Sequence, residues 1–195
     1  MKKTKLLFLA LLLPQQSVFA QYDGAIEISS LTEAQVLVVE GIDASDGMGR
    51  SVSSIGDFNN DGIDDVIVGR SGNDYGRAVI IYGNAYQYDN PLNINQITGG
   101  NGFILKGNPV MGMSVSSAGD FNGDGIDDLI VASRFYANVS VEDAVAYILF
   151  GNTSPMLQTV DLTQISPTEG VKINKPITDD AGNYKVSNAG DFNGD

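Results

Sequence analysis

The sequence predicts an all-β protein, and three observations support this fold class. Glycine makes up 23 of the 195 residues, which is about 12% against roughly 7% in average proteins and favours many tight turns. The apolar residues gather in short runs of valine, isoleucine and leucine, as in strands that are buried on both faces. No stretch after residue 20 keeps the apolar spacing of an amphipathic helix.

A block that occurs three times organises the chain. Residues 48–59 return almost unchanged as residues 111–122, and a third copy is recognisable from residue 184. The first aspartates of the three blocks lie 63 and then 71 residues apart. The predicted repeats are residues 48–107, residues 111–175 and, in part, residues 184–195.

Each repeat is predicted to supply four short strands. In the first repeat these strands are Ser51–Ile55, Val66–Val68, Ala78–Gly83 and Phe103–Lys106. The matching runs of the second repeat are Leu129–Val131, Ala144–Gly151 and Val171–Lys175, and a similar run, Val36–Gly41, precedes the first repeat. Four strands in a unit of about 65 residues describe a four-stranded antiparallel blade of a β-propeller.

The first 20 residues are predicted to be a secretory signal peptide, so that residues 21–195 form the folded part. Three lysines precede the apolar run Leu6–Leu13, which is shorter than the about 20 residues that a membrane-spanning helix needs. Val18 and Ala20 suit cleavage after Ala20. We therefore expect a protein that is secreted or held at the cell surface, with the periplasm as the alternative, and without a transmembrane segment in this chain.

Composition excludes several classes of function. The formal net charge of −13 argues against nucleic acid and anionic membranes as partners. The chain has no histidine and no cysteine, which excludes a Ser-His-Asp triad, a cysteine nucleophile and a zinc site built from thiolates or imidazoles. We therefore expect no catalytic residues here and a protein that is not an enzyme.

An acidic loop follows the first strand of each repeat, with oxygen-bearing groups at loop positions 1, 3, 5, 7 and 9. Calcium binds six to eight oxygens at about 2.3–2.6 Å, which such a tightly wound loop can supply. Gly62 and Gly125 stand at position 6, where the chain turns sharply. The predicted calcium ligands are Asp57, Asn59, Asp61, the Ile63 carbonyl and Asp65; Asp120, Asn122, Asp124, the Ile126 carbonyl and Asp128; and, in the incomplete third loop, Asp191, Asn193 and Asp195.

The other loop positions have different expected roles. Phe58 and Phe121, at position 2, should turn outwards and pack against the blade. Asp64 and Asp127, at position 8, should point away from a metal bound by their neighbours. Their side chains should face solvent or contact the residues that bind the metal.

Two other interpretations of these loop residues compete with a calcium loop of this kind. The aspartates and asparagines could merely cap turns, although the repulsion among four aspartates within nine residues would then cost stability. An EF-hand is excluded because position 12, which needs a glutamate, is Val68 or Val131 inside an apolar strand. Without that carboxylate we expect weak affinity, about 10⁻⁴–10⁻³ M.

The motif Gly-x-Ser-Val-Ser-Ser-x-Gly-Asp-Phe-Asn-x-Asp-Gly-Ile-Asp-Asp, followed by an apolar strand, resembles the FG-GAP repeat, the blade unit of the integrin alpha-chain propeller. The resemblance covers roughly residues 36–195, although Met48-Gly49 and Met111-Gly112 replace the name-giving Phe-Gly. It implies a seven-bladed propeller with calcium loops bracing the blades on one face and ligands binding mainly at the other. Because seven blades need more residues, we expect an amino-terminal piece of a longer, bacterial protein.

Two classes of function follow from these expectations. The first is a secreted calcium-binding module for cell adhesion or for binding an extracellular protein or glycan. The alternative is a non-catalytic scaffold within a larger extracellular enzyme, of the phospholipase or polysaccharide-active type. A third option is a purely structural repeat without a ligand.

Overall fold

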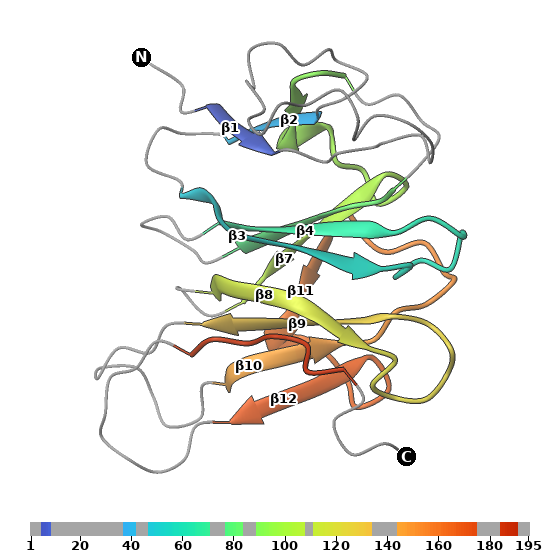
Figure 1. Ribbon diagram of the computed structural model, residues 1–195. Coiled ribbons are helices and arrows are strands. Elements are labelled where there is room, and N and C mark those ends of the chain that lie inside the picture. Colours follow the sequence, from blue (N-terminus) through green and yellow to red (C-terminus); the bar gives the residue numbers. More distant parts are fainter. Residues whose placement is uncertain are drawn as a thin grey trace, which may run out of the picture.

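The computed structural model describes residues 5–8, 37–41, 47–70, 77–83, 89–107, 111–133, 144–174 and 184–190. Within these ranges the regular elements are β-strands and two short 3-10 helices, which confirms the all-β prediction. The strands form three sheets that follow one another along the molecule (Figure 1). None of the helices in the described ranges has the length and apolar character needed to cross a membrane.

Each repeat forms its own antiparallel sheet, in the order predicted for a blade. The first sheet contains β3 (Met48–Gly56), β4 (Asp65–Arg70), β5 (Arg77–Ile81) and β7 (Gly102–Lys106). The second contains β8 (Met111–Gly119), β9 (Asp128–Ser133), β10 (Ala144–Leu149) and β12 (Gly170–Asn174). The strands β3 and β8 carry register shifts at matching places, so the two blades repeat in detail.

A short additional strand joins each repeat to the sheet before it. β11 (Thr159–Asp161) belongs to the second repeat but pairs in parallel with β7, the outer strand of the first sheet. In the same way β6 (Leu92–Asn93) pairs in parallel with β2 (Leu37–Glu40). These two strands are not predicted from the sequence, and each of them adds a strand of one repeat to the sheet that precedes it.

A single 3-10 turn follows each joining strand and anchors it. These turns are η3 (Ile94–Gln96) and η4 (Leu162–Gln164). Asn93 caps the first and Asp161 the second, each through its side chain. Ile94 and Leu162, the first residues of the turns, are almost completely buried, so the turns fasten the joining strands to the core.

The third sheet contains β1 (Lys5–Phe8), which pairs antiparallel with β2. This strand lies inside the predicted signal peptide, and its backbone pairs with an edge of β2 that would otherwise carry open backbone groups. The pairing is a property of the uncleaved chain, and removal of residues 1–20 stays a prediction.

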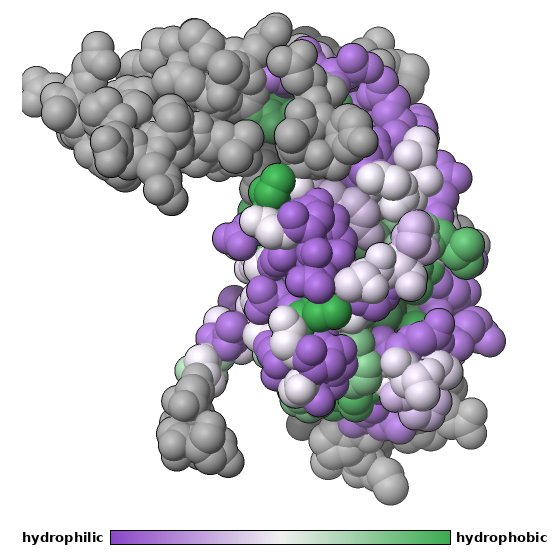
Figure 2. Space-filling view, turned by 90° about the vertical axis from the view of Figure 1, so that its right-hand side faces the viewer, coloured by the Kyte–Doolittle hydropathy of each residue, from purple (hydrophilic) through white to green (hydrophobic). Residues whose placement is uncertain are grey.

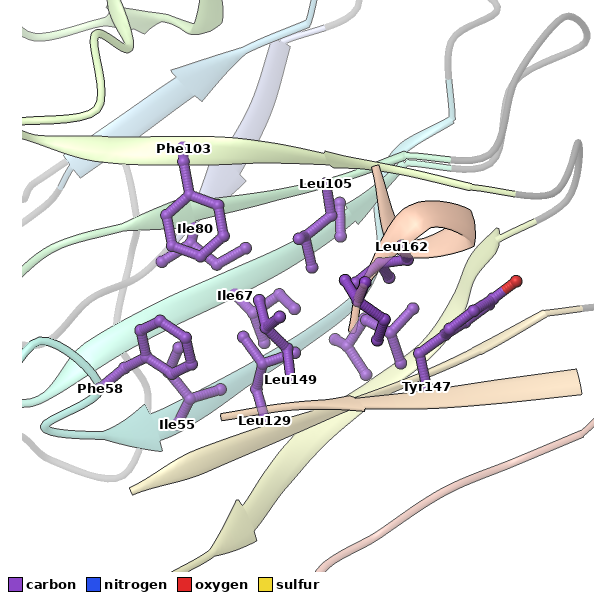
Figure 3. Close-up of a cluster of buried hydrophobic side chains, with 14 of the residues drawn as sticks. Ile55, Phe58, Ile67, Ile80, Phe103, Leu105, Leu129, Tyr147, Leu149 and Leu162 are labelled. Carbon is purple, nitrogen blue, oxygen red and sulfur yellow. The ribbon is translucent and has the colours of Figure 1, made fainter. Parts of the chain in front are cut away.

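The main hydrophobic core lies between the first and second sheets (Figure 3). Ile67, Ile80 and Phe103 of the first sheet meet Leu129 and Leu149 of the second. Successive residues of a strand point to opposite faces. The residues that alternate with these on the other face of the first sheet, such as Val68 and Val79, are also apolar. They belong to a second cluster that is shared with β2 and η3. Burial on both faces explains why the strands are continuous apolar runs.

The third copy of the repeated block begins beside the second. Val186 and Asn188 donate their backbone N–H groups to the hydroxyls of Ser114 and Ser116 in β8, at 3.1 Å in each case. In the first repeat, the Ser51 hydroxyl donates to the Gly112 carbonyl of β8 at 2.9 Å. The first segments of the three repeats therefore lie side by side, as in successive blades of a propeller.

Candidate metal centre

The two acidic loops occupy equivalent places in the fold. The first loop, residues 57–65, connects β3 to β4, and the second loop, residues 120–128, connects β8 to β9. Both lie at the same end of the sheets, on the right-hand side in Figure 1. Figure 2 looks onto this side, where hydrophilic residues cover most of the coloured surface and hydrophobic residues show between them.

The first loop is wound around its own side chains. Asp57 accepts the N–H of Asp61 through Oδ1 and the N–H of Gly62 through Oδ2, both at 2.8 Å. Asp61 Oδ1 accepts the Ile63 N–H at 3.0 Å, and Asn59 Oδ1 accepts the Asp61 N–H at 3.0 Å. Gly62 has a φ of +92°, in the left-handed region that favours glycine.

The second loop repeats this hydrogen-bond pattern. Asp120 accepts the N–H groups of Asp124 and Gly125, and Asp124 Oδ1 accepts that of Ile126, each at 2.9 Å. Asn122 Oδ1 accepts the Asp124 N–H, also at 2.9 Å. Two loops built by separate segments thus reach the same arrangement of their predicted ligands.

The aspartate at position 9 anchors each loop to its sheet. Asp65 and Asp128 are completely buried. Asp65 accepts the Phe58 N–H at 3.1 Å and the Gly83 N–H, just beyond β5, at 2.7 Å. Asp128 accepts the equivalent N–H groups of Phe121 and Gly151, both at 2.8 Å. The sequence reasoning missed this anchoring role, which an acidic residue at the start of an apolar strand could have indicated.

Burial also changes the acidity of these two carboxyls. It raises the pKa of Asp65 to about 7, against the opposing effect of the hydrogen bond from Gly83. Burial likewise raises the pKa of Asp128. A positive ion beside such a group favours its charged form. A cation in the loop would therefore lower the pKa of these two carboxyls again.

The donor chemistry of each loop fits calcium, since all five predicted ligands offer oxygen. In the described ranges no three acidic side chains form a group arranged to hold a metal ion. Asp57 and Asp65 direct oxygens to backbone amides. A carboxylate keeps further acceptor positions after such bonds, so these contacts leave ligand capacity at both residues. The third loop, with Asp191, Asn193 and Asp195, lies outside the described residues.

The phenylalanines at position 2 have different surroundings. Phe58 is completely buried, with its ring centroid 5.6 Å from that of Phe103, as predicted. Phe121 is 57% exposed, so the prediction that it packs against its blade is wrong. The reason is that Phe58 lies in the core between two sheets, and no described residue packs over Phe121 in the same way.

The aspartates at position 8 also differ. Asp64 is exposed, in agreement with its predicted orientation towards solvent. Asp127 is half-buried, and its Oδ2 accepts the N–H of Asp57 in the first loop at 3.0 Å. The second loop therefore contacts the first directly.

Comparison with known families identifies the repeat. The FG-GAP repeat family matches residues 48–87 and residues 111–148. The chain carries two FG-GAP repeats. Each match begins at the first strand of a blade and contains the complete acidic loop. The two sheets that contain these repeats are accordingly β-propeller blades, as the resemblance implied. No curated protein matches the chain.

Proposed function

We propose that this FG-GAP repeat protein is a secreted, non-catalytic module that binds calcium in its acidic loops and binds an extracellular protein or glycan in cell adhesion. The observation that supports this best is the pair of loops with the same internal hydrogen bonds and the same oxygen donors, placed where consecutive blades meet.

Calcium would be held by Asp57, Asn59, Asp61, the Ile63 carbonyl and Asp65 in the first loop, and by Asp120, Asn122, Asp124, the Ile126 carbonyl and Asp128 in the second. The ion would supply positive charge at a place where the chain concentrates negative charge. It would thereby favour the ionised state of the buried aspartates at position 9, whose pKa burial raises. Calcium in this role braces the blade junction and takes no part in a reaction.

The role in binding is supported by the architecture and by what the chain lacks. The stacked blades bury their sheet faces against one another and leave the loops at the strand ends for contact with partners. The net charge of −13 and the absence of histidine and cysteine argue against nucleic acid binding and against the common catalytic groups. A surface for an extracellular protein or glycan is consistent with both.

The test of calcium binding is thermal unfolding of the full chain in a chelator and in about millimolar calcium, the range for weak extracellular modules. We expect the melting temperature to rise with calcium in the wild type. The variant with Asp61→Ala and Asp124→Ala should lose the rise, because each change removes a position-5 ligand. Asp64→Ala is the matched control, since it removes an exposed carboxylate from the same loop. An equal melting temperature of the wild type in both buffers contradicts calcium binding.

Secretion and partner binding need separate measurements. Amino-terminal sequencing of the exported protein should find Gln21 as the first residue, and an intact Met1 in the exported protein would contradict the signal peptide. Purified extracellular matrix proteins and a glycan array, probed with the chain in calcium and in chelator, should give calcium-dependent binding. Equal binding in the two buffers would separate partner binding from the metal.

A further inference from the structure

One hydrogen bond passes between the two acidic loops. Asp127 Oδ2 accepts the backbone N–H of Asp57 at 3.0 Å, across 70 residues of sequence. Asp57 holds position 1 of the first loop, and Asp127 stands between Ile126 and Asp128, the position-7 and position-9 residues of the second. A predicted ligand of one loop is therefore joined to the segment that carries two predicted ligands of the other.

The space for this bond is provided by Gly56. This residue has a φ of +69°, and a Cβ built on it would lie 2.0 Å from Asp127 Oδ2. Any side chain at position 56 would therefore displace the Asp127 carboxylate. At the equivalent Gly119 the nearest described atom is Asn188 Nδ2, 3.9 Å from a built Cβ. The close fit over Gly56 thus belongs to the junction between the two loops.

A second connection runs in parallel with the first. The Asn152 N–H donates to the Phe58 carbonyl at 3.1 Å, and the neighbouring Gly151 N–H donates to Asp128 Oδ1 at 2.8 Å. Phe58 and Asp57 are adjacent, as are Asp128 and Asp127. Phe58 of the first loop is therefore connected to Asp128 of the second through the segment Gly151–Asn152, beside the direct bond between Asp57 and Asp127. The two loops are accordingly expected to order together.

We propose that Asp127 couples the two acidic loops, so that calcium in the second loop prepares the first and the two ions bind with positive cooperativity. This rests on the calcium binding proposed above. An ion that fixes the Ile126–Asp128 segment also fixes the acceptor of the Asp57 N–H, which leaves less ordering for the second ion to impose. The Asp127 carboxylate also places negative charge at the junction, which offsets repulsion between two bound cations.

The bond itself is tested without calcium by amide hydrogen exchange in the wild-type chain. The Asp57 N–H should exchange at least about ten-fold more slowly than the Asp120 N–H, since Asp120 holds the same loop position and has no such acceptor within the described residues. The Asp127→Ala variant should remove this difference, and Asp64→Ala should leave it unchanged. Equal exchange of the two amides in the wild type overturns the proposal without any variant.

The coupling is tested by calorimetric calcium titration of four full-length chains, namely the wild type, Asp124→Ala, Asp127→Ala and the variant with both changes. Asp124→Ala disables the second loop, so the affinity of the first loop can be compared with and without a functional neighbour. We expect that Asp124→Ala weakens the first loop about five-fold or more, at the low end of typical coupling between sites. In the presence of Asp127→Ala, the same change should have no further effect on the first loop.

The outcomes separate the two proposals. If the wild type binds two ions, and Asp124→Ala weakens the first loop equally in the presence of Asp127 and of Asp127→Ala, the role of Asp127 is overturned and calcium binding stands. Absence of calcium binding in the wild type would overturn both. Asp127→Asn keeps an oxygen acceptor for the Asp57 N–H without the charge. Coupling that survives this change is expected for a hydrogen-bonded tie, and coupling lost with it overturns the hydrogen bond as the cause.

Discussion

The first and second acidic loops have nearly the same sequence and the same internal hydrogen bonds, but their surroundings differ. Phe58 is completely buried in the core between the sheets, whereas Phe121 is 57% exposed. The Asp57 N–H bonds to Asp127 of the next repeat, whereas Asp120 has no equivalent acceptor among the described residues. The loop's own sequence therefore specifies its winding, and the following repeat specifies its burial.

This difference shows how stability is distributed in a repeat protein. Each unit contributes an internal energy and an energy of contact with its neighbours. The hydrogen bonds of the two loops belong to the first kind, since they recur unchanged at 2.8–3.0 Å and at 2.9 Å. Burial of Phe58 belongs to the second kind.

The phenylalanine pair should differ most. Phe58→Ala removes a ring from the core between the sheets and should lower the free energy of unfolding by about 3–5 kcal/mol. Phe121→Ala changes a largely exposed ring and should alter it by no more than about 0.5 kcal/mol. Urea unfolding followed by tyrosine fluorescence measures both. Equal losses in the two variants would contradict the inference that packing against the neighbouring sheet makes Phe58 more important for stability than Phe121.

The position-9 pair should respond alike, because both side chains are completely buried and accept backbone N–H groups. In calcium-free buffer, Asp65→Ala leaves the buried Phe58 amide and the partly buried Gly83 amide without an acceptor, and an unsatisfied buried amide costs about 1–3 kcal/mol. Asp128→Ala should have a similar effect on Phe121 and Gly151. Urea titration of the two variants should give losses of similar size, and a large difference between them would mean that the neighbouring repeat also supports this anchor.

The smallest effect concerns acid sensitivity at the caps of the two 3-10 turns. A hydrogen bond from the Thr163 hydroxyl, with further help from Lys106, lowers the pKa of Asp161. Lys106 Nζ lies 3.4 Å from Asp161 Oδ2 and joins β7 to β11. A lowered carboxyl pKa gives stability that is present above the ordinary value of 3.8 and is lost as the pH falls through the folded value.

The matched position in the first repeat is Asn93, which does not titrate. Asp161→Asn should therefore reduce the loss of stability between pH 6 and about pH 3 by less than about 1 kcal/mol, since Asp161 is partly exposed. The urea midpoint at the two pH values measures this. An unchanged pH profile in the variant would show that Asp161 does not contribute to the acid sensitivity of this junction.

The features that could be predicted from the sequence are those that lie within a single repeat. The blades, their strand order and the two loops follow from the repeated block at residues 48–59, from the acidic residues after it and from the apolar runs that recur in both repeats. The joining strands β6 and β11 were missed because two or three residues carry no periodicity. Aligning Leu92–Ile97 with Val160–Ile165 would have indicated them, since both segments end in an apolar residue, a polar residue, glutamine and isoleucine.

The errors at the loops have a different origin. Phe121 was expected to be buried because Phe58 and Phe121 occupy the same place in the motif, but burial depends on a neighbouring sheet that the motif does not include. The bond from Asp127 to Asp57 was also beyond the sequence, because it joins residues of two repeats at a distance that only the packing of the blades determines. Local patterns describe a unit, and contacts between units need the assembled fold.

The joining strands have a consequence for how this chain could be lengthened or shortened. Since β11 completes the edge of the first sheet and β6 completes the edge next to β2, removing one whole sheet would strip a strand from its neighbour. A deletion of residues 98–165 would instead run from the end of one 3-10 turn to the end of the next. It would place β12 where β7 stood and keep β6 on β2. The segment that can be duplicated or deleted while every strand edge is preserved therefore does not coincide with a blade. It begins one strand earlier, at the last strand of the preceding blade.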